Sequence, residues 1–159
     1  MGASSASGSS GLSVADKTFV KKAAQGGMAE VELGKLATER ASNPDVKKFG
    51  QRMVDDHSKA NDELKQVASP ENITLPTSLD AKDEATKQKL SALSGAAFDR
   101  AYMSDMVGDH TKDVSEFRHE SASSRNPAVK DFATKTLPTL ESHLKEAKKI
   151  APEVHANQQ

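Results

Sequence analysis

One short motif occurs twice in this 159-residue chain, each time at the start of a long stretch with helical periodicity. The two copies are Asn43-Pro44-Asp45-Val46-Lys47-Lys48-Phe49 and Asn126-Pro127-Ala128-Val129-Lys130-Asp131-Phe132. Asparagine is a good N-cap and proline is tolerated at the first helical position, so each motif predicts the start of a helix. Each copy also follows another long helical stretch through a short loop. The repeat therefore predicts two helical hairpins in tandem.

Apolar spacing extends the two hairpins into four long helices. We expect them at about Ser13 to Ala41, at Pro44 to Ala68, at about Ala96 to Ser121, and from Pro127 to near Ile150. The connection between the second and third helices holds a short helical piece at about Lys82 to Leu93, and it is long enough to cross the roughly 35 Å of a long helix. The prediction is an all-α, ferritin-like antiparallel four-helix bundle, in which a long crossover with a short extra helix joins two hairpins. The alternative is a conventional loop followed by a packed fifth helix.

The composition agrees with this fold and excludes several classes of protein. Aromatic residues make up 4% of the chain, which suits closely packed Ala-rich helices better than a β-sandwich. The net charge is -1, with 22 basic and 23 acidic residues mixed along the chain, so we expect no nucleic-acid partner. No apolar run approaches the length of a transmembrane helix. The absence of Cys excludes disulfides, thiol catalysis and Cys-ligated metal sites.

The length predicts one domain, which we place at residues 14–151. Residues 1–13 are rich in Ser and Gly and lack the apolar segment of a signal peptide, so we interpret them as a flexible linker or the remnant of a tag. Residues 152–159 are predicted to form a polar tail.

Each long helix carries one metal-capable polar residue inside its apolar stripe, close to the middle of the helix. These residues are Glu30, His57, His110 and His143. An α-helix turns about 100° per residue, and this places His57 and His110 at the centres of apolar faces. His143 lies towards one edge of its face, and the helix of Glu30 is apolar on two sides. In a bundle, the four side chains can converge on one internal layer.

Such a layer predicts a metal site, because a buried carboxylate without a partner costs several kcal/mol and buried imidazoles need hydrogen bonds. A divalent ion would satisfy all four residues together, and Zn, Fe, Mn, Ni and Cu all accept such ligands. Asp56 and Asp113, at the edges of the stripes, can add a ligand or orient a His through its second nitrogen. In the alternative, each His bonds a backbone carbonyl, a carboxylate or trapped water, and Glu30 pairs with a His or lies at a wet end of the bundle.

The ligand pattern differs from that of dinuclear carboxylate enzymes, which use two Glu-x-x-His pairs and two further Glu. The segment Glu116-Phe117-Arg118-His119 has this spacing, but it lies on the face opposite His110, and we interpret it as solvent-facing. One inward carboxylate among three His favours a mononuclear or structural site. Neither this pattern nor any nucleophile motif indicates an enzyme.

Four motifs in the chain, taken in order, resemble a known family. They are Gly26-Gly27-Met28-Ala29-Glu30-Val31-Glu32, Met53-Val54-Asp55-Asp56-His57, Ala96-Ala97-Phe98-Asp99-Arg100-Ala101-Tyr102 and Leu137-Pro138-Thr139-Leu140-Glu141-Ser142-His143. From about Asp16 to Ala151 the chain resembles the bacterial domain-of-unknown-function family "four-one-four-two". The resemblance implies a ferritin-like fold and a location in the periplasm, in the cell envelope or outside the cell, with the native signal segment missing from this sequence. It implies no established activity.

Two functional hypotheses follow. The first is an exported ferritin-like protein that binds a metal ion inside its bundle through Glu and His side chains, with a role in stress protection. The second is a non-enzymatic interaction or structural module of the cell envelope, without a metal, whose polar core residues give packing specificity. The sequence leaves association with the envelope and homo-oligomerisation open.

Overall fold

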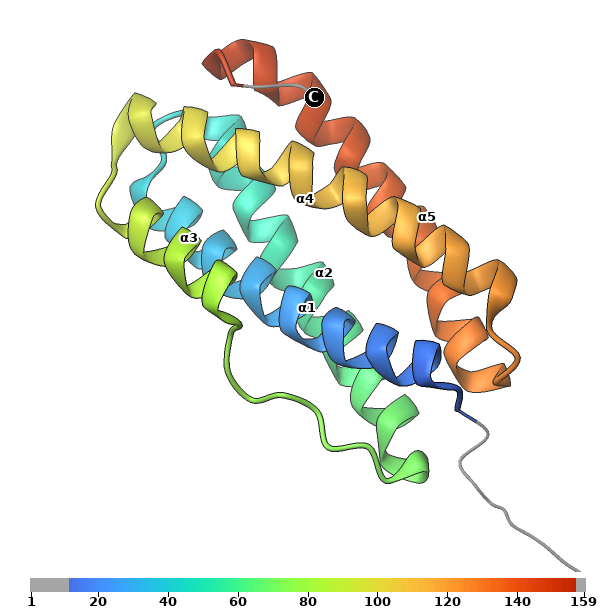
Figure 1. Ribbon diagram of the computed structural model, residues 1–159. Coiled ribbons are helices and arrows are strands. Elements are labelled where there is room, and N and C mark those ends of the chain that lie inside the picture. The colour runs from blue at the N-terminus through green and yellow to red at the C-terminus, as the bar shows by residue number, and fades with distance from the viewer. Residues whose placement is uncertain (1–11, 157–159) are drawn as a thin grey trace, which may run out of the picture.

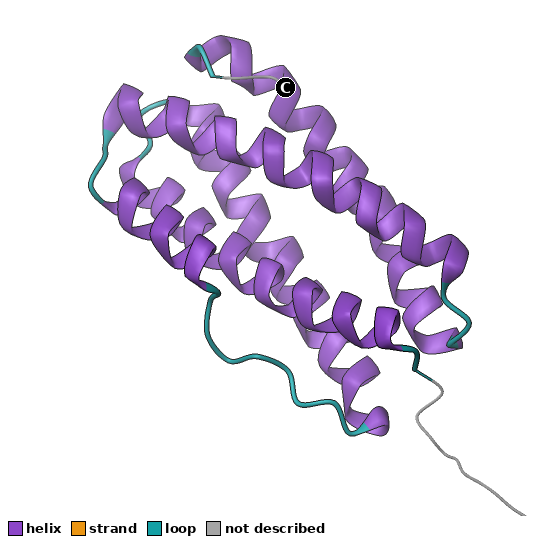
Figure 2. Cartoon of the chain, in the orientation of Figure 1, coloured by secondary structure: helices purple, strands orange, loops and turns teal. Residues whose placement is uncertain are grey.

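The computed structural model describes residues 12–156, and within this range it contains helices and no β-strand (Figure 2). The long helices are α1 (Val14–Arg40), α2 (Pro44–Ala68), α4 (Gly95–Ser123) and α5 (Pro127–Ile150) (Figure 1). A shorter helix, α3 (Ala81–Ser91), and two 3-10 turns, η2 (Ser69–Glu71) and η3 (Ala151–Val154), complete the described elements. The predicted helices are therefore confirmed, with ends that differ by only one or two residues.

The topology is two antiparallel hairpins joined by a crossover. α1 packs along α2 and α4 packs along α5, while α1 also contacts α4 and α2 also contacts α5. The segment from Ser69 to Ser94, which includes α3, returns along the bundle, so α4 starts at the end where α2 starts (Figure 1). α2 and α4 therefore run parallel on opposite corners of the bundle. The predicted crossover is confirmed, and a conventional loop in its place is wrong.

Both Asn-Pro motifs cap their helices as the sequence predicts. The Asn43 side chain accepts two backbone N–H bonds, at 2.7 and 3.3 Å, and the Asn126 side chain accepts one at 3.1 Å. The buried carboxylate of Asp99 in α4 additionally accepts backbone N–H bonds from Ser42 at 3.0 Å and Asn43 at 2.9 Å. The first hairpin loop is thus fixed to the second hairpin, because a buried charged acceptor is satisfied there by backbone donors.

The apolar core consists of two clusters. One includes Phe49 and Tyr102, and the other includes Phe19 and Phe117. On each long helix, one buried polar residue lies between the residues that belong to the two clusters. These four residues are Glu30, His57, His110 and His143. A polar layer therefore crosses the middle of an otherwise apolar interior.

The two ends of the predicted domain need correction. Ser13 is not linker: it caps α1, and its side chain accepts a 3.0 Å bond from the Asp16 N–H. The predicted polar tail is also wrong at its start, because Val154 and Ala156 are buried in the core. Pro152 is tolerated in the first turn of η3, and the left-handed conformation of His155 folds the chain back onto the bundle. The remaining linker and tail residues, 1–11 and 157–159, lie outside the described residues.

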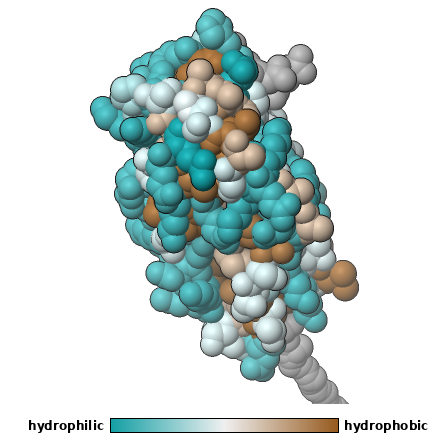
Figure 3. Space-filling view, turned by 90° about the vertical axis from the view of Figure 1, so that its left-hand side faces the viewer, coloured by the Kyte–Doolittle hydropathy of each residue, from teal (hydrophilic) through white to brown (hydrophobic). Residues whose placement is uncertain are grey.

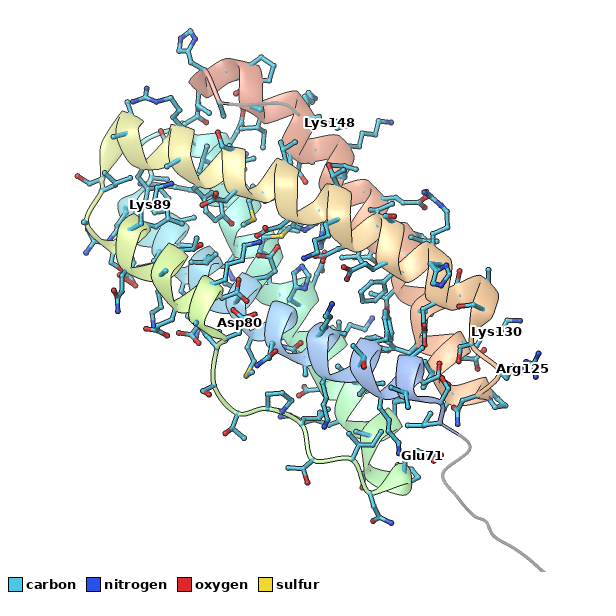
Figure 4. The ribbon with its side chains drawn as sticks, in the orientation of Figure 1. Glu71, Asp80, Lys89, Arg125, Lys130 and Lys148 are labelled. Atoms are coloured by element: carbon cyan, nitrogen blue, oxygen red, sulfur yellow. The ribbon has the colours of Figure 1, made fainter. Side chains whose placement is uncertain are left out.

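The face in Figure 3 is mostly hydrophilic, with scattered apolar areas. Charged side chains such as Lys130 and Lys148 point away from the helices (Figure 4). None of the helices in residues 12–156 combines the length and the apolarity that crossing a bilayer requires.

Candidate metal centre

Three histidine side chains from three helices meet in the polar layer. They are His57 of α2, His110 of α4 and His143 of α5, and all three are buried. One ring nitrogen from each lies within 4.8 Å of the other two. Nitrogens that share one ion through bonds of about 2 Å lie roughly 3–4 Å apart. A small inward movement of the rings would therefore let all three bind one ion.

The hydrogen bond of His110 leaves one nitrogen free. Its Nδ1 lies 2.9 Å from the backbone carbonyl oxygen of Met106. A carbonyl only accepts, so Nδ1 carries the proton and donates it. In the neutral ring, Nε2 then presents a lone pair, and this buried atom has no hydrogen-bond partner. The carbonyl of the preceding helical turn therefore selects the tautomer that a metal ion needs.

His143 is oriented in the same way by a carboxylate. Its Nε2 lies 2.8 Å from Oδ2 of Asp56 and donates to it, while its buried Nδ1 has no partner. Arg52 in turn donates to Asp56 at 3.3 Å and to Ser142 at 2.9 Å. A carboxylate that holds the outer nitrogen is the usual support of a metal-binding His. This is the orienting role that the sequence analysis considered for Asp56.

Nε2 of His57 is also buried without a hydrogen-bond partner. Burial lowers the pKa of His57 well below its usual value, and His110 and His143 lower it further. Burial likewise lowers the pKa of His110 to about 3, and it lowers that of His143 against the opposing effect of Asp56. All three rings are therefore neutral at physiological pH. The hydrogen bonds of His110 and His143 turn two ring lone pairs inward, and a neutral His57 can supply a third, so the site favours a cation.

Glu30 lies beside the histidines and outside their closest group. Its side chain is 3% exposed, and its Oε2 is 3.5 Å from Nε2 of His110. This Oε2 has no hydrogen-bond partner. Burial raises the pKa of Glu30 well above its usual value, and the nearby charges of Asp109 and Asp113 raise it further. Two acceptor atoms face each other here, so a proton or a metal ion is needed between them.

Asp113 and His119 lie outside the group of three buried histidines. Among the described residues, no hydrogen bond joins Asp113 to a histidine ring; Asp113 lines a cavity between α1, α3 and α4 together with Glu30 and Asp109. The orienting role considered for Asp113 stays a prediction, and Asp113 also lines a small cavity whose wall includes His57. His119 is exposed on α4, as the sequence predicts.

Tyr102 is a polar residue of this region that the sequence analysis missed. It is fully buried, and its hydroxyl has no hydrogen-bond partner. Burial raises the pKa of Tyr102 well above its usual value, and Glu30 is the largest charged contributor. Tyr102 precedes His110 by eight residues, which places it about 80° from His110 around α4, at the edge of the apolar face, so the periodicity alone did not single it out.

Comparison with known proteins identifies the family. The family model described as "Domain of unknown function (DUF4142)" matches residues 1–150. The chain belongs to this family. Its resemblance to the family named from four sequence motifs is thereby confirmed. Among curated protein sequences, none matches the chain.

Solved structures with the same fold include DUF305 proteins and CopM. A predicted secreted DUF305 protein from Streptomyces coelicolor has a TM-score of 0.77 at 14% identity, over 91% of this chain and 95% of that chain. A DUF305 fragment from Deinococcus radiodurans has a TM-score of 0.76 at 14% identity, over 89% and 97%. CopM in its Ag-bound form has a TM-score of 0.71 at 16% identity, over 87% and 96%. At these identities the likeness is one of fold.

Proposed function

We propose that this DUF4142 protein binds one transition-metal ion in the polar layer, through His57, His110 and His143, with Glu30 as an adjacent carboxylate. The observation that carries the proposal is the set of free atoms: Nε2 of two histidines, Nδ1 of the third and Oε2 of Glu30 are all buried without a partner. Buried polar atoms are almost always hydrogen-bonded. A cation between these four atoms would give each of them a partner.

Three neutral imidazoles suit Cu, Zn, Ni and Fe better than Ca or Mg, which prefer oxygen ligands. Manganese stays in the test set because Glu30 adds an oxygen. CopM, which shares the fold, has been solved with Ag and also with Cu(II) bound, and this supports copper as the first metal to test. In the bound state, Met106 and Asp56 would hold the rings of His110 and His143 in place.

We further propose that the protein works outside the cytoplasm, in the periplasm, in the cell envelope or secreted, and that it protects the cell by sequestering metal. The similar Streptomyces coelicolor protein, which is a predicted secreted protein, supports the location. A buried histidine site in a chain without Cys also suits an oxidising compartment, because the chain has no thiol that could be oxidised. Localisation of the full-length native protein by cell fractionation tests this point, and an unprocessed cytosolic form would contradict it.

The test of metal binding uses protein stripped of metal. Titration with Cu(II), Zn(II), Ni(II), Mn(II) and Fe(II) is followed by calorimetry, and the Cu(II) complex is measured by electron paramagnetic resonance. We expect saturation at one ion per chain and nitrogen hyperfine coupling from several imidazoles. His110→Ala removes saturable binding, whereas His119→Ala, which changes an exposed histidine of the same helix, retains it.

The contrary outcome is also defined. If His110→Ala binds metal as well as the unchanged protein does, the ion binds at another site. If none of the five metals shows saturable binding, the protein is a structural or interaction module of the envelope, and its polar layer serves only packing.

A further inference from the structure

An acidic cavity lies beside the proposed metal centre, between α1, α3 and α4. Its volume is about 130 Å³, enough for several water molecules. Six carboxylates line it, together with three lysines. The carboxylates belong to Glu30, Asp80, Asp83, Asp109, Asp113 and Glu116. Burial raises the pKa of Asp113 to about 7, and Asp109 and Glu116 add to the shift, which indicates how closely these groups are crowded. Asp80 marks the start of α3 at the rim of this cavity (Figure 4).

A second, smaller cavity of about 40 Å³ reaches the metal centre from within the bundle, because His57 is part of its wall. Four residues line both cavities, so the two adjoin. They are Lys22, Gly26, Asp113 and Glu116. The acidic cavity is thus separated from the ring of His57 by only the small inner cavity.

Gly26 lies where the two cavities meet, and its missing side chain leaves an opening between α1 and α4. A Cβ atom at this position would have no heavy atom within 4 Å. At Gly27, by contrast, a Cβ would lie 2.0 Å from Oδ1 of Asn61. Close helix packing therefore accounts for Gly27 and does not account for Gly26. Glycine weakens a helix interior, so its presence at position 26 needs another reason.

Glu30 joins the acidic cavity to the histidines. It is one helical turn beyond Gly26 on α1, it lines the acidic cavity, and its unpartnered Oε2 lies 3.5 Å from Nε2 of His110. A buried carboxylate without a partner, at the inner end of an acidic cavity, is a position that a passing cation can occupy.

We infer that hydrated divalent transition-metal ions reach the histidine site from the acidic cavity, through the opening at Gly26 and past Glu30. This inference rests on the proposed metal binding. The cavity carboxylates raise the local concentration of cations and speed their capture, an effect that salt weakens. Gly26 keeps the passage open, and the lone pairs of the histidines hold the ion at its inner end.

The first experiment measures the rate of Cu(II) binding by stopped flow, through the quenching of Tyr102, the single tyrosine of the chain. Gly26→Leu fills the opening and lowers the association rate constant at least tenfold, with one bound ion and the same nitrogen hyperfine pattern at equilibrium. Gly108→Leu is the matched control: a Cβ there also has open space, Gly108 lies in the middle of α4, and it lines neither cavity. This control keeps the rate of the unchanged protein.

A second pair of variants tests the charges. Asp80→Asn with Asp83→Asn removes two carboxylates from the rim and leaves an Asn that can still cap α3. At low ionic strength we expect the association rate to fall at least threefold, and the difference to vanish at high salt. The control is Asp131→Asn, an exposed carboxylate of α5 that lines neither cavity.

The outcomes separate the two proposals. If the unchanged protein binds Cu(II) and Gly26→Leu binds it equally fast, the access route is wrong and the metal centre stands. If the unchanged protein binds no metal, both are wrong. An equal loss of rate in Gly108→Leu would also overturn the route, because it would trace the effect to leucine in a helix rather than to the opening.

Discussion

Two clusters of buried polar groups join α1 to α4, and they differ in how many protons would satisfy them. Near the end of the bundle, the carboxyl groups of Asp16 of α1 and Glu120 of α4 lie close enough to shift each other's pKa, and Oε2 of Glu120 is buried without a hydrogen-bond partner. Two carboxyl groups can bond only if one holds a proton, and burial together with the adjacent Asp16 raises the pKa of Glu120 to about 8. A proton on Glu120 lets it donate to the ionised Asp16 and completes this pair.

In the middle of the bundle, Glu30 of α1 faces His110 of α4, and no such bond closes the gap. His110 and His143 have already used their ring protons on groups outside the cluster, namely Met106 and Asp56. The comparison teaches that one proton completes the acidic pair, whereas a proton on Glu30, whose pKa burial raises, would close only the contact with His110 and leave the buried nitrogens of His57 and His143 without partners. The metal ion proposed above would supply the missing partner.

The largest expected effect is on the Asp16–Glu120 cluster. Asp16→Ala removes the hydrogen bond from the Ser13 N–H to the Asp16 side chain, one half of the capping box of α1 and worth about 1 kcal/mol, and it leaves Glu120 without its buried partner, which costs roughly 1–3 kcal/mol. We expect the free energy of unfolding in urea to fall by about 2–4 kcal/mol. The exposed Asp131→Ala should change it by less than about 0.5 kcal/mol. A loss of the same small size in Asp16→Ala would mean that this cluster does not stabilise the fold.

The next effect concerns the central layer and depends on metal. At a free Cu(II) concentration of about 100 times Kd, the free energy of unfolding should rise by about 2.7 kcal/mol. For a domain of this size that corresponds to a Tm increase of roughly 5–10 °C in a heating curve. His110→Ala should lose the increase, and His119→Ala should keep it. Stabilisation that survives in His110→Ala would show that the ion binds elsewhere.

The third effect is a pH dependence of the Asp16–Glu120 cluster. The folded-state pKa of Glu120 is raised, so its contribution to stability is complete below about pH 4.5 and is lost as pH rises through about 8. The pKa of Asp16 is lowered, and its contribution is lost only below the usual range of Asp, so it does not interfere above about pH 5.

Between pH 5 and pH 9 Glu120 should therefore contribute a loss on the order of 2 kcal/mol to the unchanged, metal-free protein, since each pKa unit corresponds to about 1.4 kcal/mol and nearby water reduces the full value. The raised pKa values of Glu30, Asp109 and Asp113 add a loss of the same sign in both proteins. Glu120→Gln keeps a donor for Asp16 at every pH, and its loss over this range should be smaller by the contribution of Glu120. Urea unfolding at a series of pH values measures both curves, and parallel curves would contradict the shared proton.

The smallest expected effect is on metal affinity and concerns the role of Asp56. Asp56→Asn weakens the acceptor that holds the ring of His143, and loss of such a support lowers metal affinity by about tenfold. Its neighbour provides the control, because Asp55 bonds Gln51 on the surface and Asp55→Asn leaves the site untouched. Calorimetric titration of the two variants measures the difference, and equal affinities would mean that Asp56 does not orient His143.

Much of this architecture is local in origin and could be predicted from the sequence. A capping residue acts on the next few N–H groups, and apolar periodicity acts within one helix, so Asn43, Asn126 and the central positions of His57 and His110 were apparent without a fold. The crossover also followed from the sequence, because the length of the second connection matches the length of the bundle.

Contacts between helices could not be predicted from the sequence, because they depend on how each helix is rotated and shifted against its neighbours. Asp56 and Asp113 both lie at stripe edges in the sequence, yet one meets His143 across α2 and α5 and the other faces the cavity beside α3. The pairing of Asp16 with Glu120, and the opening at Gly26, likewise join residues far apart in the chain. The sequence by itself determined four long helices, two of them with Asn caps, their connectivity and the residue types in the polar layer. Only the tertiary structure decided which nitrogen of each histidine stays free, because that choice is made by acceptors in the surrounding structure.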